Sequence, residues 1–191
     1  MDILPCKHDR KSPFSTPGIR LTRGLLLGFI MVSSLTIAHA EVIEGRVVRI
    51  VDGDTIVVEG QGIRQKVRLS AIDTPERDQP WGDSATREMR RLVAGKDVSV
   101  HWYKTDRWDR LIGNVLVDGE DAGLLMVERG MAWHFKRYAD EQTPADRKAY
   151  EAAEQAARKA RRGLWSDPQP IPPWEWRKPP SRFDSSGTAS T

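Results

Sequence analysis

The fold is decided by the stretch VDGDTIVVEGQGIRQKVRLS, residues 51–70. Two turn signals, Asp52-Gly53-Asp54 and Gly60-Gln61-Gly62, each join segments whose composition favours β-strands. In the last segment Val67 and Leu69 fall on one face, whereas Lys66 and Arg68 fall on the other. Together with the valine- and isoleucine-rich residues 41–51, the stretch predicts a three-stranded antiparallel meander.

The residues after this meander predict two more strands and three helices. Spacing of apolar residues predicts strands over 97–103 and 110–117 and helices over 84–93, 121–128 and 144–162. Five strands with a helix between the third and the fourth indicate a small closed barrel. We therefore expect an α+β, mainly β fold: an OB-like five-stranded barrel with three helices.

Residues 166–191 contain six of the twelve prolines and end in Ser, Gly and Thr. This composition predicts a Pro/Trp-rich tail after a domain that spans residues 41–165. We expect Trp174 and Trp176 to pack against that domain.

The N-terminal segment has the pattern of a secretory signal. Arg20 and Arg23 precede an apolar run from Leu25 to Ile37, and Ala38-His39-Ala40 follows with small residues at the cleavage positions. We expect residues 1–40 to be removed and the mature chain to be periplasmic or secreted; the alternative is an uncleaved anchor. The only cysteine, Cys6, would be removed too, which excludes cysteine nucleophiles and thiolate metal sites in the mature protein.

The formal charge of +3 does not indicate a polyanion partner. Residues 1–40 carry five basic and two acidic side chains, so residues 41–191 hold 25 of each and are neutral overall. A site for an anionic substrate must therefore come from local placement of charge.

Three carboxylates lie beside predicted turns: Asp54 in the first hairpin, and Asp73 and Glu76 just after the third strand. Hard cations such as calcium prefer several oxygen ligands, and the mature sequence has no histidine pair that favours zinc. Arg68 lies on the polar face of the third strand, five residues before Asp73, and Arg110 opens the fifth strand. The planar guanidinium of arginine matches phosphate oxygens. Taken singly, each residue also fits a plain role as a turn, a helix cap or a solvated strand charge.

The order of these motifs resembles the staphylococcal (micrococcal) nuclease family, the thermonucleases. The resemblance covers residues 42–165 and is carried by VDGDT at 51–55, VRL at 67–69, IDTPE at 72–76 and TDRWDR at 105–110. It implies an OB-like barrel that binds one calcium ion and cleaves DNA and RNA to 3′-phosphate ends.

The resemblance also implies roles for individual residues. Asp54 and Asp73 would be calcium carboxylates, and the carbonyl of Thr74 a further ligand. Glu76 matches the glutamate proposed as general base. Arg68 and Arg110 match the arginines that hold the scissile phosphate, with Arg110 nearest the leaving group.

The sequence departs from the family pattern in ways that bear on substrate preference. The loop at residues 77–82 is short, Asp109 stands where glycine is common, and Trp108 where tyrosine is usual. We expect Trp108, His134 and Phe135 to contact the nucleic acid. We also expect a monomer without stable membrane association once the signal is cleaved.

Two other functions fit parts of the sequence. OB-type domains often bind single-stranded nucleic acid without cutting it, and such a domain would not need the acidic residues and arginines together. A structural envelope protein could instead use the Pro/Trp-rich tail for docking. The intact set of Asp54, Asp73, Glu76, Arg68 and Arg110 favours the enzyme.

Overall fold

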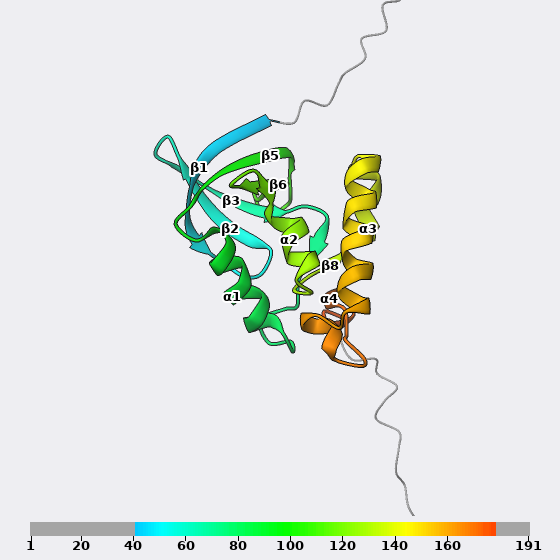
Figure 1. Ribbon diagram of the computed structural model, residues 1–191. Coiled ribbons are helices and arrows are strands. Elements are labelled where there is room, and N and C mark those ends of the chain that lie inside the picture. The colour runs from blue at the N-terminus through cyan, green and yellow to red at the C-terminus, as the bar shows by residue number, and fades with distance from the viewer. Residues whose placement is uncertain (1–40, 179–191) are drawn as a thin grey trace, which may run out of the picture. The chain divides into compact units, whose positions relative to one another are not determined.

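The computed structural model describes residues 41–178 (Figure 1). The expected signal segment and Cys6 lie outside the described residues. Within them, no helix has the length and apolar character needed to cross a membrane.

Five strands form the closed barrel that the sequence predicts. They run in the order β3-β2-β1-β5-β6, and a parallel pairing of β3 with β6 closes the sheet. The remaining neighbours pair antiparallel. The strands are β1 (Glu41–Ile50), β2 (Thr55–Gly60), β3 (Ile63–Leu69), β5 (Asp97–Thr105) and β6 (Leu111–Val117).

Alternation of side chains along the strands places the core inside the barrel. Val67 and Leu69 on β3 are buried in it, so Arg68 between them points to the opposite face. Arg68 pairs in register with Thr55, which directly follows the first turn. The predicted alternation is therefore confirmed, and it aims an arginine at the turn that contains Asp54.

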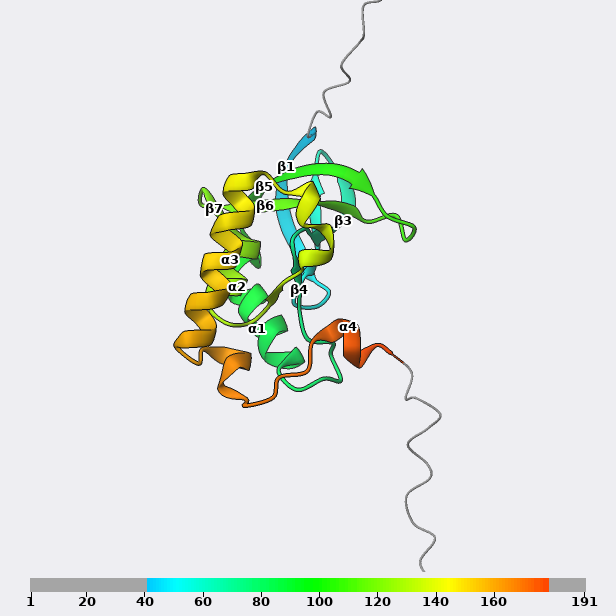
Figure 2. The ribbon, with the colours of Figure 1, turned by 90° about the vertical axis from the view of Figure 1, so that its right-hand side faces the viewer.

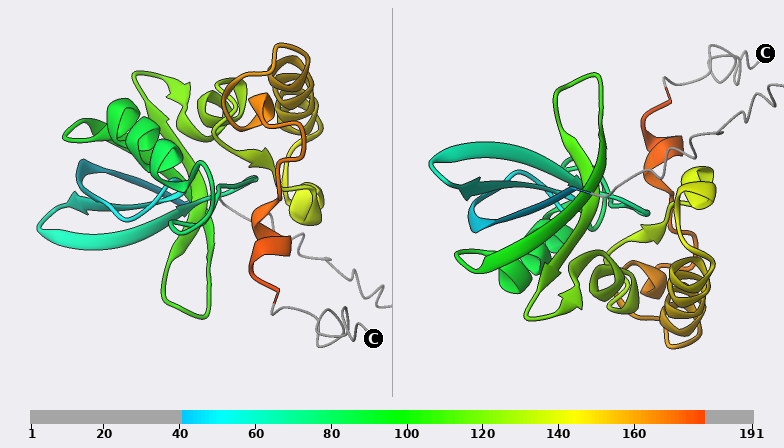
Figure 3. Two further views of the ribbon diagram at one scale, coloured as in Figure 1. Left: turned by 90° about the horizontal axis from the view of Figure 1, so that it is seen from below. Right: turned by 90° about the horizontal axis from the view of Figure 1, so that it is seen from above.

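The three predicted helices are present: α1 (Gly82–Val93), α2 (Ala122–Glu128) and α3 (Pro144–Lys159). α1 adds Ala85, Met89, Leu92 and Val93 to the barrel core. Side chains of Asp121 and Thr143 accept backbone N–H groups at the starts of α2 and α3. Views from below and above show the barrel on one side and α2 with α3 on the other (Figure 3).

Several short elements were not predicted. β4 (Ile72–Asp73) pairs with β8 (Trp133–His134), which joins the loop after the barrel's third strand to the segment before α3. The others are β7 (Glu120–Asp121), the 3-10 helices η1 (Lys136–Glu141) and η2 (Gly163–Ser166), and α4 (Pro173–Trp176). Two-residue strands are too short to have a sequence period, so pattern analysis does not detect them.

The packed structure continues past the predicted domain boundary at residue 165. From the end of α3 the chain passes below α1 to α4 (Figure 2). The Trp174 ring lies 6.3 Å from that of Trp133 and 5.5 Å from that of Phe135, so the expected packing of Trp174 is confirmed. Trp176 is 37% exposed but donates from Nε1 to Asp78 Oδ1 at 3.3 Å.

Candidate active site

Asp54 and Asp73 converge on one guanidinium at the end of the barrel. Arg68 Nη2 lies 2.9 Å from Asp73 Oδ1 and 3.5 Å from Asp54 Oδ2. Both carboxylates are buried, and the side chain of Asp73 has no exposed surface. The structure thus brings together three residues that are 14 and 5 positions apart in the sequence, as the meander predicts.

Close packing fixes the turn that holds Asp54. Thr74 donates to Asp54 Oδ2 from both its backbone N and its Oγ1, each at 3.2 Å. A Cβ at Gly53 would lie 2.8 Å from Thr74 Oγ1 and 2.9 Å from the Ala85 Cβ, so only glycine fits there. The hairpin turn, the loop after β4 and the first turns of α1 are therefore locked against one another.

Burial and crowding of like charge shift the acidic groups of this cluster. Burial, together with the neighbouring charge of Asp54, raises the pKa of Asp52 to about 6. Burial also raises the pKa of Asp73, against the opposing effect of bonds from Arg177 and Arg68. For Arg68, burial lowers the pKa, but the charges of Asp54 and Asp73 outweigh it and raise the pKa overall. The cluster holds excess negative charge that a cation would relieve.

Glu76 lies on the loop between β4 and α1. Its backbone N–H donates to Gln79 Oε1 at 3.0 Å, and a Cβ at Gly82 would collide with its carbonyl oxygen. The backbone of Glu76 is therefore fixed by its own loop, while its side chain remains 36% exposed to the cleft.

Arg110 is held by the loop that precedes β6. Asp106 accepts from Arg110 Nε at 2.8 Å and lies 2.7 Å from Nη2. Asp109 has φ of 59°, in the left-handed region that favours glycine. The Trp108 ring is 58% exposed and lies 4.0 Å from the Arg107 guanidinium and 5.0 Å from that of Arg110.

A cleft of about 730 Å³ connects these groups. Seven of the predicted site residues line it: Asp54, Arg68, Thr74, Glu76, Trp108, Arg110 and Phe135. Asp73 does not line it, because Arg68 and Arg177 bond to its oxygens from the cleft side. The site is thus an open groove with arginines, carboxylates and exposed aromatic rings on its walls.

His134 does not reach this cleft. Its side chain is buried, its ring lies 5.5 Å from that of Tyr150, and its Nε2 lies 2.7 Å from Gln142 Oε1. The pairing of β8 with β4 turns this side chain toward α3, away from the groove. The expected substrate contact by His134 therefore has no support in the structure.

Other residues of the cleft were not singled out from the sequence. Tyr103 and Lys104 lie at the end of β5, Arg137 and Tyr138 lie on η1, and Arg177 follows α4. Arg177 bonds to Asp73 and Glu76 from more than 100 positions away. Its position next to the Pro/Trp-rich run gave no indication of such a contact.

The donor chemistry of the cluster fits one hard cation. Within residues 41–178, no group of three or more His, Cys, Asp or Glu side chains is arranged as a metal site. Two buried carboxylates, Asp54 and Asp73, do meet at one guanidinium, and Thr74 lies against Asp54. Calcium accepts such oxygen ligands together with backbone carbonyls and water, so these residues suit it without a third carboxylate.

Comparison with known proteins shows that the chain is similar to nucleases. Residues 66–167 match the family model for staphylococcal nuclease homologues. The chain is 42% identical over 137 residues to an uncharacterized endonuclease of Escherichia coli O157:H7, covering 71% of this chain and 85% of the relative. It is 40% identical over 145 residues to micrococcal nuclease of Shigella flexneri, covering 70% and 80%. A match to an uncharacterized endonuclease of Haemophilus influenzae covers 83% of this chain and 84% of the relative at 35% identity.

The family model covers more than half of the chain, and two of these relatives share at least 40% of aligned residues with it. The barrel and its helices agree with the same family. The protein therefore belongs to the staphylococcal nuclease family of phosphodiester hydrolases.

Proposed function

We propose that the protein is a calcium-dependent endonuclease that hydrolyses DNA and RNA to products with 3′-phosphate ends. The observation that carries this proposal is that Arg68, Glu76 and Arg110 line one open cleft beside the buried pair Asp54 and Asp73. Membership of the nuclease family and similarity to proteins named endonuclease and micrococcal nuclease support it.

The arginines supply the binding site for the scissile phosphate. Arg68 and Arg110 enter the cleft from β3 and from the start of β6, and each is already oriented by a carboxylate. Fixed guanidinium groups stabilise the negative charge that develops on a phosphate under attack, without reorganisation at the moment of reaction. Arg110 would face the 5′ oxygen that leaves.

Glu76 is the group that would receive the proton of the attacking water. Its partly exposed carboxylate lies in the cleft, and its backbone is fixed by Gln79 and the start of α1. The water oxygen bonds to phosphorus and the P–O5′ bond breaks. The leaving 5′ oxygen takes a proton from solvent and becomes a hydroxyl, and Glu76 returns to solvent the proton that it received. The phosphate stays on the 3′ side, as the family resemblance implies.

Asp54, Asp73 and the carbonyl of Thr74 are the ligands that we assign to one calcium ion. When bound there, calcium would contribute positive charge to stabilise the phosphate in the transition state. The raised pKa values of Asp52 and Asp73, caused first by burial, agree with a cluster built for a cation.

The open cleft favours an extended, single-stranded substrate. The exposed Trp108 ring and Phe135 line it and offer surfaces on which bases stack. A base-stacking surface does not select a sugar, so we propose that both DNA and RNA are cut. We also propose that the enzyme is a monomer, exported to the periplasm or the medium and free of the membrane after cleavage of residues 1–40.

The test uses single-stranded DNA and RNA of defined sequence with calcium, with EDTA and with calcium restored. We expect internal cuts with 3′-phosphate and 5′-hydroxyl ends only when calcium is present. Cleavage that persists in EDTA contradicts the metal's role. Tight binding without cleavage in any condition would instead favour a non-catalytic OB-type binding domain.

Export is tested separately by N-terminal sequencing of the protein from a bacterial host. We expect the periplasmic or secreted fraction to begin at Glu41. A membrane fraction that retains residues 1–40 would identify the segment as an anchor.

A further inference from the structure

Arg177 bridges the two carboxylates on which the proposed chemistry depends. Its Nη2 donates to Asp73 Oδ2 at 2.5 Å, its Nη1 lies 3.3 Å from Asp73 Oδ1, and Nη1 also donates to Glu76 Oε1. Arg68 Nη2 bonds to Asp73 Oδ1 as well. Both oxygens of the fully buried Asp73 carboxylate are therefore occupied by guanidinium groups.

Arg177 belongs to a segment that packs against the domain. We call this segment, residues 167–178, the C-terminal strap. Gln79 Nε2 donates to the carbonyl of Ile171, and Trp176 donates to Asp78. The Trp174 ring packs on Phe135 with ring centres 5.5 Å apart. The strap is thus anchored on the loop that carries Glu76, and α4 lies beside η1 in both views of Figure 3.

The charges of the cluster make this arginine a substitute for a metal ion. Asp52, Asp54, Asp73 and Glu76 gather there, whereas Arg110 is paired with Asp106. Without Arg177, Arg68 alone would compensate four carboxylates. Arg68 bonds to Oδ1 of Asp73, so Arg177 and a divalent cation compete for Oδ2. Two cations within a few ångströms of each other repel strongly at a buried carboxylate.

We infer that, in the metal-free protein, Arg177 occupies the Asp73 oxygens that would bind calcium and also pairs with Glu76. Calcium must displace Arg177 from Asp73 to bind. This inference rests on the proposed calcium site at Asp54 and Asp73. Competition is reciprocal: the strap weakens calcium binding, and calcium binding releases Arg177 from Asp73. The concentration at which the enzyme loads calcium is then set in part by the strap.

The test is calorimetric titration of the full chain with calcium alone, without substrate. Arg177→Ala should lower the calcium Kd by about tenfold, within the five- to 150-fold range of ordinary coupling between sites. Lys178→Ala is the matched control, because it removes the same charge one residue away and bonds to neither carboxylate. Its Kd should stay within about twofold of the wild type, since the exposed ammonium acts only at long range.

Two results separate failure of this inference from failure of the proposed calcium site. If Asp73→Asn abolishes calcium binding but Arg177→Ala and Lys178→Ala shift the Kd equally, the site stands and the competition is rejected. If Asp73→Asn binds calcium as the wild type does, the assigned site and the competition both fail.

Hydrogen exchange of the strap gives a second readout that does not depend on activity. Calcium should accelerate amide exchange at residues 174–178 of the wild type. In Arg177→Ala the exchange should already be fast without calcium and change little when it is added. Unchanged exchange in the calcium-loaded wild type would show that the strap is not displaced.

Discussion

The carboxylate of Asp106 both shapes the loop before β6 and orients the guanidinium of Arg110. Its Oδ2 accepts from Arg110 Nε at 2.8 Å, while its Oδ1 accepts the backbone N–H groups of Trp108 and Arg110 at 2.9 and 3.1 Å. Burial acts to raise the pKa of Asp106, but the bonds from Arg110 and Trp108 prevail and lower it. The carboxylate therefore stays ionised and keeps the guanidinium at the cleft wall.

Replacement of Asp106 by asparagine should reduce turnover while leaving the fold intact. Asparagine keeps an acceptor oxygen for the loop but loses the charge-assisted bonds to Arg110. We expect kcat to fall about tenfold, less than in Arg110→Ala, which removes the guanidinium itself. Asp118→Asn, at an exposed aspartate paired with Lys96, is the control and should leave kcat unchanged. An unaltered kcat in Asp106→Asn would exclude a positioning role.

Trp108 should contribute to substrate binding and not to stability. Because its ring is 58% exposed, Trp108→Ala should leave the melting temperature unchanged. Loss of one stacked base costs about 1–3 kcal/mol, so KM for single-stranded substrate should rise about tenfold. Trp108→Phe preserves an aromatic face and should restore most of the binding. Equal KM values for the alanine variant and the wild type would show that Trp108 does not contribute to substrate binding.

The ion pairs of Glu88, away from the active site, predict that part of the protein's stability to unfolding depends on pH. Bonds from Arg91, and then from Arg129, outweigh partial burial and lower the pKa of Glu88 below its ordinary 4.5. A lowered pKa stabilises the fold above the unfolded-state value, and this contribution disappears as pH falls through the folded-state value. Glu88→Gln should therefore lower the melting temperature at pH 7 by about 2 °C.

Thermal unfolding at pH 7 and again well below pH 4.5 checks this prediction. The difference between Glu88→Gln and the wild type should vanish at the lower pH. Glu120→Gln removes the same charge at an exposed site on β7 and should show no such difference. A difference that persists in acid would indicate a packing effect and not an ionic one.

The barrel and most of the site were predictable because their signals are local. Val67 and Leu69 alternate with Arg68 along one strand, and Asp54 lies in a turn with a clear composition. Once the meander is recognised, the register of antiparallel pairing places Arg68 opposite Thr55. Asp73 and Glu76 follow the same strand closely, so they cannot lie far from it.

The remaining features depend on contacts between distant segments. Arg177 reaches Asp73 across 104 positions, and neither residue carries a pattern that refers to the other. His134 was expected at the substrate, but the short pairing of β8 with β4 directs it into the interior. The packing of residues 166–178 depends on Trp133 and Phe135, whose positions follow only from that pairing.

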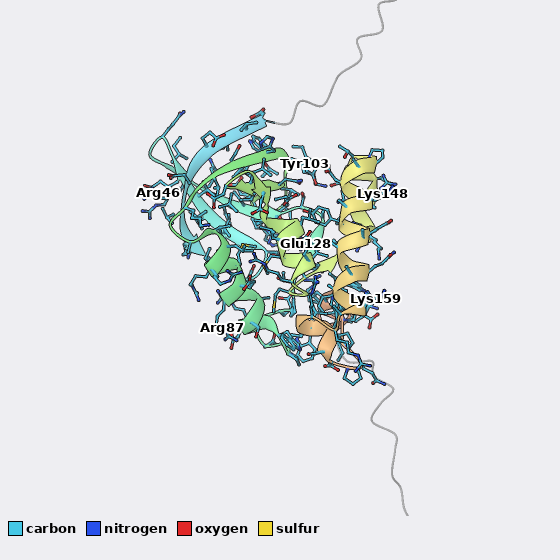
Figure 4. The ribbon with its side chains drawn as sticks, in the orientation of Figure 1. Arg46, Arg87, Tyr103, Glu128, Lys148 and Lys159 are labelled. Carbon is cyan, nitrogen blue, oxygen red and sulfur yellow. The ribbon has the colours of Figure 1, made fainter. Side chains whose placement is uncertain are left out.

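Single-turnover cleavage of a calcium-saturated, single-stranded oligonucleotide tests most directly whether Glu76 and Arg110 act on the phosphate. The comparison uses Glu76→Gln, Arg110→Ala and, as control, Arg46→Ala. Arg46 forms an exposed ion pair with Asp97 on the barrel, away from α3 and outside the cleft (Figure 4). We expect the cleavage rate to fall by about 10² to 10³ in the first two variants, with unchanged circular dichroism, and to stay unchanged in the third. A wild-type rate in Glu76→Gln or Arg110→Ala would contradict the assigned active site.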